Sequence, residues 1–201
     1  CFSLSDITIP DTVTRIGECA FLGCSGLETL DMSANIKVIE SSAFVSCVGL
    51  LAINIKNIAN WCQVSFDGTG SNPLYYAGNL YVDGYRTTSV TIPEGVTEIK
   101  PRAFEGCKAL SSVYLPSSLR VIGEYAFSEC SKLFSVTYGH SELKWSYLTI
   151  KAGNSKLTSS NRVYTYGNSA NTKNLTFINN VWYYTPNGNI DYSYTGLTDY
   201  N

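Results

Sequence analysis

Residues 4–24 read LSDITIPDTVTRIGECAFLGC, and residues 27–47 read LETLDMSANIKVIESSAFVSC. The two stretches place apolar side chains, an Ala-Phe pair and a Cys at matching positions, with a constant period of 23 along the sequence. The same spacing returns later in the chain, where residues 90–107 match residues 113–130. A fixed period of this length is the sequence signature of a stacked repeat protein. We therefore predict a solenoid built from coils of equal length.

Each repeat divides into a short strand, a stop signal and a return turn. Ile7 and Ile9 lie two positions apart, so both side chains point to one face of an extended strand. Pro10 then ends the strand, as Pro93 and Pro116 do later, because a residue without an N–H group cannot continue the ladder. The spacings of three and four that follow are typical of tight helical turns. We expect one strand per coil, with short helical or 3-10 turns on the opposite face.

A single coil cannot fold alone, because its few large apolar side chains do not offset the conformational entropy lost when the whole coil is ordered. Stacked coils gain hydrogen bonds between parallel strands and close a continuous apolar interior. The phenylalanine of each Ala-Phe pair is therefore expected in a single dry column along the stack. These residues are Phe21, Phe44, Phe104 and Phe127.

Seven cysteines would suggest a disulfide framework in an exported protein, but five of them hold one repeat position. We predict that these five form an inward ladder of reduced, buried thiols, because side chains on parallel rungs point the same way. Cys19 and Cys62 lie off this ladder, where each either fills the core or pairs or reacts. The ladder consists of Cys1, Cys24, Cys47, Cys107 and Cys130.

The third repeat is longer than the others. It begins regularly with Ile53 and Ile55, then leaves the pattern for an insertion at about residues 57–86. Asp83-Gly84 is a typical two-residue hairpin turn between alternating side chains, so we expect a hairpin to project here. The aromatic side chains of this insertion are candidate contacts for a partner. They are Trp61, Tyr75, Tyr76, Tyr81 and Tyr85.

The A-F-x-x-C signature together with I-P-x-x-V strands resembles the BspA-like leucine-rich repeats of bacterial surface proteins, over residues 1–138. Residues 72–84 resemble the N-P-L-Y-Y-A-x-N-L-Y-V-x-G unit that arrays of this family often carry. Residues 139–157 resemble the G-x-x-x-x-W…I…G-N-x-x-L segment that often ends such arrays. Two sites depart from the pattern: Met32-Ser33 replaces I-P, and Lys100-Pro101 stands where a Gly is usual.

This resemblance implies a right-handed leucine-rich-repeat solenoid with one short parallel strand per repeat. It also implies an exported protein of anaerobic or host-associated bacteria, located at the cell surface or secreted. Adhesion to host proteins or to other cells has been proposed for some members of the family. Since one fold serves many partners, the family alone does not assign a ligand.

The solenoid is expected to occupy residues 1–160, including an array-ending segment at about residues 139–160. Cys1 aligns with Cys24, so we expect the chain to begin inside a repeat, where no signal peptide is visible. A first strand cut from its preceding unit can pair with another molecule, so a dimer would be a truncation artefact. Residues 161–174 are predicted to be a tail and linker, because residues 167–174 are small and polar.

An aromatic β hairpin is predicted within residues 175–201, where residues 181–184 and 190–194 flank a Pro-Asn-Gly turn sequence. Residues 177–197 resemble one copy of the W-Y-Y…G…Y-x-G-L repeats of bacterial wall-binding proteins. That resemblance implies choline or glucan ligands in aromatic cages between successive hairpins, and one hairpin cannot complete a cage. Alternatively, these aromatic side chains pack together or cap the solenoid. The candidate contacts are Trp182, Tyr183 and Tyr194.

Composition and motifs argue against catalysis, cofactors and nucleic acid. The 14 basic and 16 acidic residues are scattered, so no basic stripe faces a phosphate backbone. No apolar run reaches the roughly 18 residues of a membrane span, and no Cys and His cluster has zinc-ligand spacing. The sole histidine, His140, follows the last repeat strand and has no nucleophile placed beside it by any motif. Asp6 and Asp31 are neighbours in the stack, but no other feature supports them as a catalytic carboxylate pair. We expect no enzyme, metal or cofactor.

A binding scaffold is the leading hypothesis, because an extended array offers a long face to a host or bacterial surface protein or to a cell-wall glycan. The outward strand positions, among them Asp31 and Asn54, are small and polar apart from Tyr114, which is a further candidate contact. A passive spacer or wall-attachment segment is the first alternative. The second is an accessory module of a larger exported enzyme.

Overall fold

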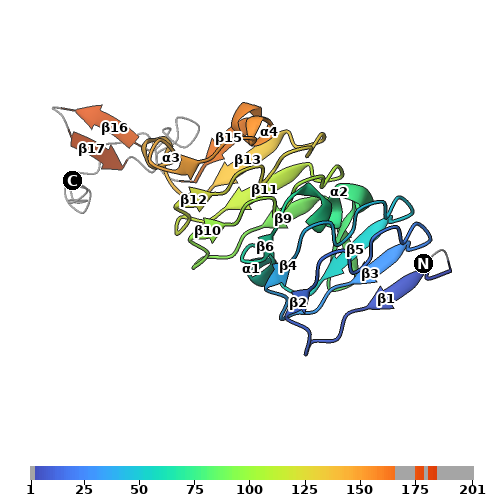
Figure 1. The fold of residues 1–201 in the computed structure, drawn as a ribbon. Helices are drawn as coiled ribbons and strands as arrows, with labels where there is room; N and C mark the ends of the chain where they lie inside the picture. The colour runs from blue at the N-terminus through green and yellow to red at the C-terminus, as the bar shows by residue number, and fades with distance from the viewer. Residues whose placement is uncertain (1–2, 166–174, 179–180, 185–201) are drawn as a thin grey trace.

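The computed structural model of the chain describes residues 3–165 and two further strands, β16 (Leu175–Ile178) and β17 (Val181–Tyr184). Residues 3–165 form a stack of coils in two blocks, each with a longer sheet and a sheet of three short strands (Figure 1). Two short helices, α1 (Ile58–Trp61) and α2 (Leu74–Ala77), lie between the blocks in that view.

The first block contains the coils up to residue 87. Its longer sheet has the order β1-β3-β5-β7-β8, in which all neighbours are parallel except β7 and β8. Its shorter sheet has the order β2-β4-β6. The strands are β1 (Asp6–Thr8), β2 (Arg15–Ile16), β3 (Thr29–Asp31), β4 (Val38–Ile39), β5 (Ala52–Ile55), β6 (Ser65–Phe66), β7 (Leu80–Val82) and β8 (Tyr85–Thr87).

The second block repeats this arrangement with an all-parallel sheet β9-β11-β13-β15 and a shorter sheet β10-β12-β14. Strand partners in regular coils, such as Asp6 with Thr29 and Ser112 with Ser135, keep the sequence separation of 23, which confirms the predicted register. The strands are β9 (Ser89–Thr91), β10 (Glu98–Ile99), β11 (Ser112–Leu115), β12 (Val121–Ile122), β13 (Ser135–Tyr138), β14 (Thr149–Ile150) and β15 (Asn161–Tyr164).

The repeated apolar positions form one continuous core. Leu30, Ile53, Val113 and Val136, which share the first inward strand position, are at most 2% exposed. Ile7 holds that position in the first coil and is only partly buried, because among the described residues a neighbouring coil covers it on one side alone. The inward and outward strand positions predicted from the alternation are therefore confirmed.

The phenylalanine rings stack, but in two pairs instead of the predicted single column. Phe21 lies on Phe44 with ring centroids 5.1 Å apart, and Phe104 lies on Phe127 at 5.3 Å. In the regular coils, the backbone N–H of the phenylalanine donates to the carbonyl of the alanine in the next coil, as Phe104 does to Ala126. The N–H of Phe44 donates instead to the carbonyl of Gly70 at 2.9 Å. The long third repeat therefore stands between the two pairs.

The cysteine ladder is inward, as predicted. Cys24, Cys47, Cys107 and Cys130 are at most 5% exposed, and Cys1 lies outside the described residues. The Sγ of Cys47 donates to the carbonyl of Phe21 at 3.0 Å, and the Sγ of Cys130 donates to that of Phe104 at 3.1 Å. These thiols thus contact the preceding coil without forming a bridge. Off the ladder, Cys62 is buried, and Cys19 is exposed at a left-handed turn position with φ 57°.

The long third repeat is a coil of the stack and does not project as a whole. After α1 the chain forms β6, a 3-10 turn (Thr69–Ser71), α2 and then β7, which pairs in parallel with β5. Only β8 folds back, across the predicted turn at Asp83 (φ 49°) and Gly84 (φ 81°), which confirms the hairpin. Positive φ at both turn residues is the geometry that an Asp-Gly pair favours.

This repeat also joins the two blocks, which corrects the role expected for Trp61. Its ring is 2% exposed, and its Nε1–H donates to the carbonyl of Ala103 at 2.7 Å. Asn72 Nδ2 donates to the carbonyl of Arg102 at 2.5 Å, and a Cβ on Gly106 would overlap the backbone of Tyr75. Trp61 therefore packs between coils and cannot contact a partner.

The last described coil has the construction of the third. Helix α3 (Glu142–Trp145) ends on a tryptophan as α1 does, and both helices are followed by a strand of the shorter sheet. The offset along the sequence from Trp61 to Trp145 is the same as the offset from β6 to β14. Helix α4 (Ser155–Ser159) then leads into β15, as α2 leads into β7. We call residues 57–82 the inner long unit and residues 139–164 the outer long unit.

Strand β15 corrects the predicted end of the solenoid. Residues 161–164 were expected to open a tail, but they pair with β13 in parallel, with Ser135 opposite Asn161. The strands β16 and β17 form an antiparallel pair, in which Leu175 is opposite Tyr184. The strand predicted at residues 190–194 lies outside the described residues.

Candidate binding surface

Polar side chains on the outer face of the first block's longer sheet form a ladder that runs from coil to coil. Asp31 is its centre: its Oδ2 accepts from the Thr8 hydroxyl at 3.4 Å, and its Oδ1 accepts from Asn54 Nδ2 at 2.7 Å. Asn54 Oδ1 in turn accepts from the backbone N–H of Gly84 at 2.9 Å. The parallel register places Thr8, Asp31 and Asn54 directly beside one another, so hydrogen bonds join neighbouring rungs.

A shallow hollow of about 270 Å³ opens beside this ladder. Ala52 forms part of its floor, because the small side chain leaves space that a larger one would fill. Tyr81 of β7 provides an aromatic wall and is half-buried. The hollow is lined by Thr29, Leu30, Asp31, Ala52, Asn54, Tyr81 and Gly84.

Carboxylates give this face a negative character. The Thr29 hydroxyl, which donates to Asp6, holds the pKa of the Asp6 carboxyl below its usual value. After β1, the Asp11 carboxylate accepts from the Ala34 N–H at 2.9 Å and pairs with Lys56 at 2.9 Å, so its charge is balanced. The Ala34 bond, and then the Lys56 partner, lower the pKa of Asp11. Both carboxylates are therefore ionised at neutral pH.

The predicted aromatic contacts do not converge on one site. Tyr81 lies at the hollow, Tyr85 is 80% exposed on β8, and Tyr114 is half-buried on the second block, where its hydroxyl lies against Gly139. Tyr75 and Tyr76 lie on α2, with their rings edge to face at 5.4 Å. Trp182 and Tyr183 belong to β17, whose side chains are not described, and Tyr194 lies outside the described residues.

Sequence reasoning placed Asp31 and Asn54 on the outer face but did not select them as contacts. The available signal was that three consecutive coils carry Thr8, Asp31 and Asn54 at one repeat position, whereas the matching coils of the second block carry Thr91, Tyr114 and Thr137. Adjacent rungs with hydrogen-bonding groups of opposite kind can bond one another. That pattern distinguishes the first block from the second.

The described residues offer little nucleophilic or metal-binding chemistry. No group of three His, Cys, Asp or Glu side chains gathers in them to hold a metal ion. Burial raises the pKa of Cys62 and of Cys107 to about 12, so these thiols stay protonated at neutral pH. None of the helices in this part of the chain is long and apolar enough to cross a membrane.

Comparison with protein families decides the relationship. Residues 1–73 and 79–183 match the model described as BspA type leucine rich repeat region, in six copies. The chain belongs to this family. The BspA-type match extends beyond residue 157, where the sequence resemblance to this family ended, and includes β15 and β16. The solenoid fold and its kinship with bacterial surface repeats are thereby shown.

Solved structures similar to this BspA-type chain are leucine-rich-repeat proteins. A leucine rich cell surface protein from Faecalibacterium prausnitzii A2-165 is 27% identical with a TM-score of 0.32, and the match covers 74% of this chain but only 30% of that protein. A leucine rich repeat protein of T. pallidum is 23% identical with a TM-score of 0.40, over 76% of this chain and 73% of that one. A Bacteroides ovatus protein is 20% identical with a TM-score of 0.30, over 80% and 55%. No curated protein matches the chain.

Proposed function

We propose that the chain is the recognition part of an exported, noncatalytic bacterial surface protein, and that it binds a protein or glycan partner on the outer face of the first block. The observation that carries this proposal is the hydrogen-bonded ladder of Thr8, Asp31 and Asn54 beside the hollow. The match to the BspA-type family supports the extracellular location.

The ladder suits recognition because its side chains are already held in place. Ordered side chains lose little rotamer freedom when a partner binds, so more of the interaction energy appears as affinity. Each oxygen of Asp31 accepts one bond from a neighbouring rung and keeps a lone pair for a donor of the partner. Tyr81 adds an aromatic surface with a polar end, which interfaces favour.

The matched positions of the second block provide a control on the same scaffold. Asn54 corresponds to Thr137, and Thr8 corresponds to Thr91, since both pairs occupy one position in the parallel strands. Substitutions at either set leave the apolar core untouched. A difference in binding between the two sets therefore reports on the outer face and not on folding.

The experiment is retention of the chain on bacterial wall preparations and on immobilised matrix proteins. Asp31→Ala with Asn54→Ala is expected to reduce retention by about tenfold or more, as at interface hot spots. Thr91→Ala with Thr137→Ala should retain like the wild type, and both variants should melt within a few degrees of it. Equal retention of the two variants, or no retention of the wild type as for a passive spacer, would contradict the proposal.

Treatment of the retaining fraction then identifies the partner class. Loss of retention after protease treatment indicates a protein, and loss after periodate oxidation indicates a glycan. Binding of a protein and binding of a glycan should each be weakened by Asn54→Ala, because the proposed contact is on the ladder in both cases.

A further inference from the structure

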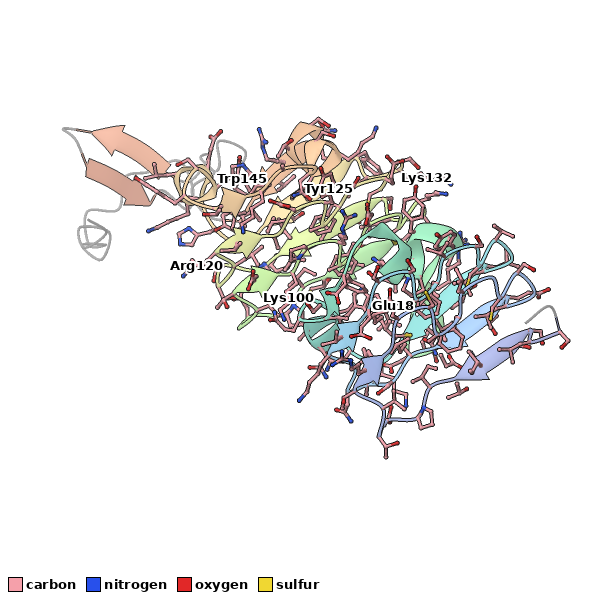
Figure 2. All side chains as sticks on the ribbon, in the orientation of Figure 1. Glu18, Lys100, Arg120, Tyr125, Lys132 and Trp145 are labelled. Carbon is pink, nitrogen blue, oxygen red and sulfur yellow. The ribbon has the colours of Figure 1, made fainter. Side chains whose placement is uncertain are left out.

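A second hollow, of about 200 Å³, lies where the outer long unit meets the coil before it, and its chemistry differs from that of the first hollow. Leu119, Tyr138 and Leu148 are buried and form an apolar floor, while Arg120, Lys144 and Tyr147 are exposed around it. Figure 2 labels Arg120 and Trp145 in this last part of the stack. The lining residues are Leu119, Arg120, Tyr138, His140, Lys144, Tyr147 and Leu148.

Basic groups from three segments converge on this hollow. Arg120 precedes β12, His140 follows β13, and Lys144 belongs to α3. Among the described residues, neither Arg120 nor Lys144 forms an ion pair. Burial first, and then the charges of Lys144 and Arg120, lower the pKa of His140, so its ring is neutral at pH 7. The two cations therefore act together on a chain whose formal net charge is -2.

One acidic side chain near this hollow, Glu94, is already engaged. Burial raises the pKa of the Tyr138 phenol, and the charges of Arg120 and Glu94 reach the same group. The Glu94 carboxylate accepts the backbone N–H groups of Ser117 at 3.0 Å and Ser118 at 3.3 Å. Arg120 Nη1 donates to the carbonyls of Ser117 at 2.8 Å and Leu119 at 3.0 Å, and Lys144 Nζ lies 6.0 Å from the centroid of the Tyr147 ring. The remaining N–H groups of these two cations are available to a different anion.

The inner long unit shows that this hollow is not required by the construction. Lys144 and Tyr147 correspond to Asn60 and Gln63, by the same offset that relates Trp145 to Trp61. Asn60 Nδ2 donates to the carbonyl of Ala34 at 3.0 Å, and Gln63 Nε2 donates to that of Glu98 at 2.7 Å, so both amides bond neighbouring coils. At the outer long unit, a cation and a phenol ring replace them and stay exposed. The exchange removes two groups that bond neighbouring coils and adds a positive charge and an aromatic ring at the surface.

We propose that this cationic hollow binds one carboxylated sugar unit of an acidic glycan. The carboxylate accepts charge-assisted hydrogen bonds from Arg120 and Lys144, which are stronger than hydrogen bonds between neutral groups. The apolar face of the sugar lies on the ring of Tyr147. The hollow is smaller than the roughly 300 Å³ at which drug-sized pockets begin, so it holds a single ring. This site is on a different block from the Asp31 ladder and does not depend on it.

Titration of the whole chain with four probes, followed by NMR or calorimetry, tests the site. The probes are glucuronate and N-acetylneuraminate as carboxylated sugars, glucose as the neutral sugar, and inorganic phosphate as the bare anion. Both carboxylated sugars should bind measurably more tightly than glucose or phosphate. Phosphate binding equal to that of the sugars, or no binding of any probe, would overturn the proposal.

Variants separate the charge contribution from the ring contribution. Arg120→Gln and Lys144→Gln should each weaken glucuronate binding by about tenfold, the usual effect of losing a charged hydrogen bond. Tyr147→Ala should weaken both carboxylated sugars alike. Lys132→Gln is the matched control, because Figure 2 places this exposed lysine well away from Arg120. If Lys132→Gln reduces binding as much as Lys144→Gln, the sugars are held by general attraction to positive charges and not by a specific site, which would overturn the proposal.

Discussion

The inner and outer long units have the same parts but meet different neighbours. Both contain a four-residue helix ending on a tryptophan, a short strand, a second helix and a strand of the longer sheet. The inner unit is covered by the next coil, and Trp61 bonds Ala103 there. The outer unit is the last coil of residues 3–165, and Trp145 is half-buried, with the Arg162 guanidinium 5.3 Å from its ring centroid. The neighbour, and not the unit itself, therefore sets how deeply the tryptophan is buried.

The difference suggests how one module serves two purposes in a repeat array. Where another coil follows, the module continues the apolar core from one coil to the next, because Trp61 and Leu74 are at most 2% exposed. At the outer unit, other described residues surround Trp145, including Tyr138 at 5.6 Å and Tyr164 at 6.4 Å between ring centroids.

The largest expected effect follows from the two tryptophans. Trp61→Ala should lower the free energy of unfolding by about 3 to 5 kcal/mol, because it removes a buried ring and leaves the Ala103 carbonyl without its partner. Trp145→Ala should cost about 1 to 2 kcal/mol, since its ring is already partly in water. Urea unfolding of both variants measures the difference. Equal costs would mean that the inner unit is not covered as described.

A smaller effect is expected at the buried asparagine of the outer unit. Asn154 Oδ1 accepts the N–H of Phe127 at 2.9 Å, and its Nδ2 donates to the carbonyl of Gly123 at 2.9 Å. Its side chain thus does for Phe127 what a carbonyl of the next coil does for Phe104. Asn154→Ala should cost about 2 to 3 kcal/mol, because a buried N–H loses its acceptor.

The exposed neighbour Ser155 provides the control for this prediction, as Ser155→Ala should change the free energy of unfolding by less than about 0.5 kcal/mol. Thermal unfolding with calorimetry compares the two variants. An Asn154→Ala protein as stable as Ser155→Ala would show that the coil end does not depend on this side chain.

Much of the fold could be predicted because its signals repeat. The constant repeat period fixed the strand register and the inward positions, and the Asp83-Gly84 pair identified the hairpin from local turn geometry alone. Trp61 was misassigned because a residue in an insertion has no repeat position to compare. The correspondence between Trp61 and Trp145, in the two long units, was the missing comparison.

The candidate surfaces were harder to predict for a different reason. Asp31 and Asn54 were recognised as outward, but the bond between them depends on side-chain geometry across two coils. Arg120 and Lys144 lie in different coils, and no motif links them in the sequence. Surface sites of a solenoid are assembled by stacking, so their residues become neighbours only when the register and the irregular units are known.

The smallest predicted effect is a change with pH in the stability of the coil that contains Glu105, which follows the inner long unit. Glu105 is 3% exposed and pairs with Arg102 at 2.7 Å, whereas Leu22 at the matching position of the first coil is 49% exposed. Burial raises the pKa of Glu105 above its usual 4.5 despite the Arg102 partner. The folded state therefore holds this proton more tightly than the unfolded state, so the contribution of Glu105 to stability falls as the pH rises above about 4.5.

Glu105→Gln removes this titration. The stability of the variant relative to the wild type is expected to increase between pH 4.5 and 7, by under about 1 kcal/mol. Melting temperatures of both proteins across that range give the comparison. A relative stability that falls with rising pH would mean that the Arg102 pair outweighs burial.

Fluorescence of single-tryptophan proteins tests most directly whether the inner long unit is an interior coil that joins the two blocks. One protein keeps Trp61 and carries Trp145→Phe and Trp182→Phe, and the other keeps Trp145 and carries Trp61→Phe and Trp182→Phe. The Trp61 protein should emit at shorter wavelength and resist acrylamide quenching, while the Trp145 protein should be quenched readily. A Trp61 that is quenched as easily as Trp145 in a folded protein would contradict the account.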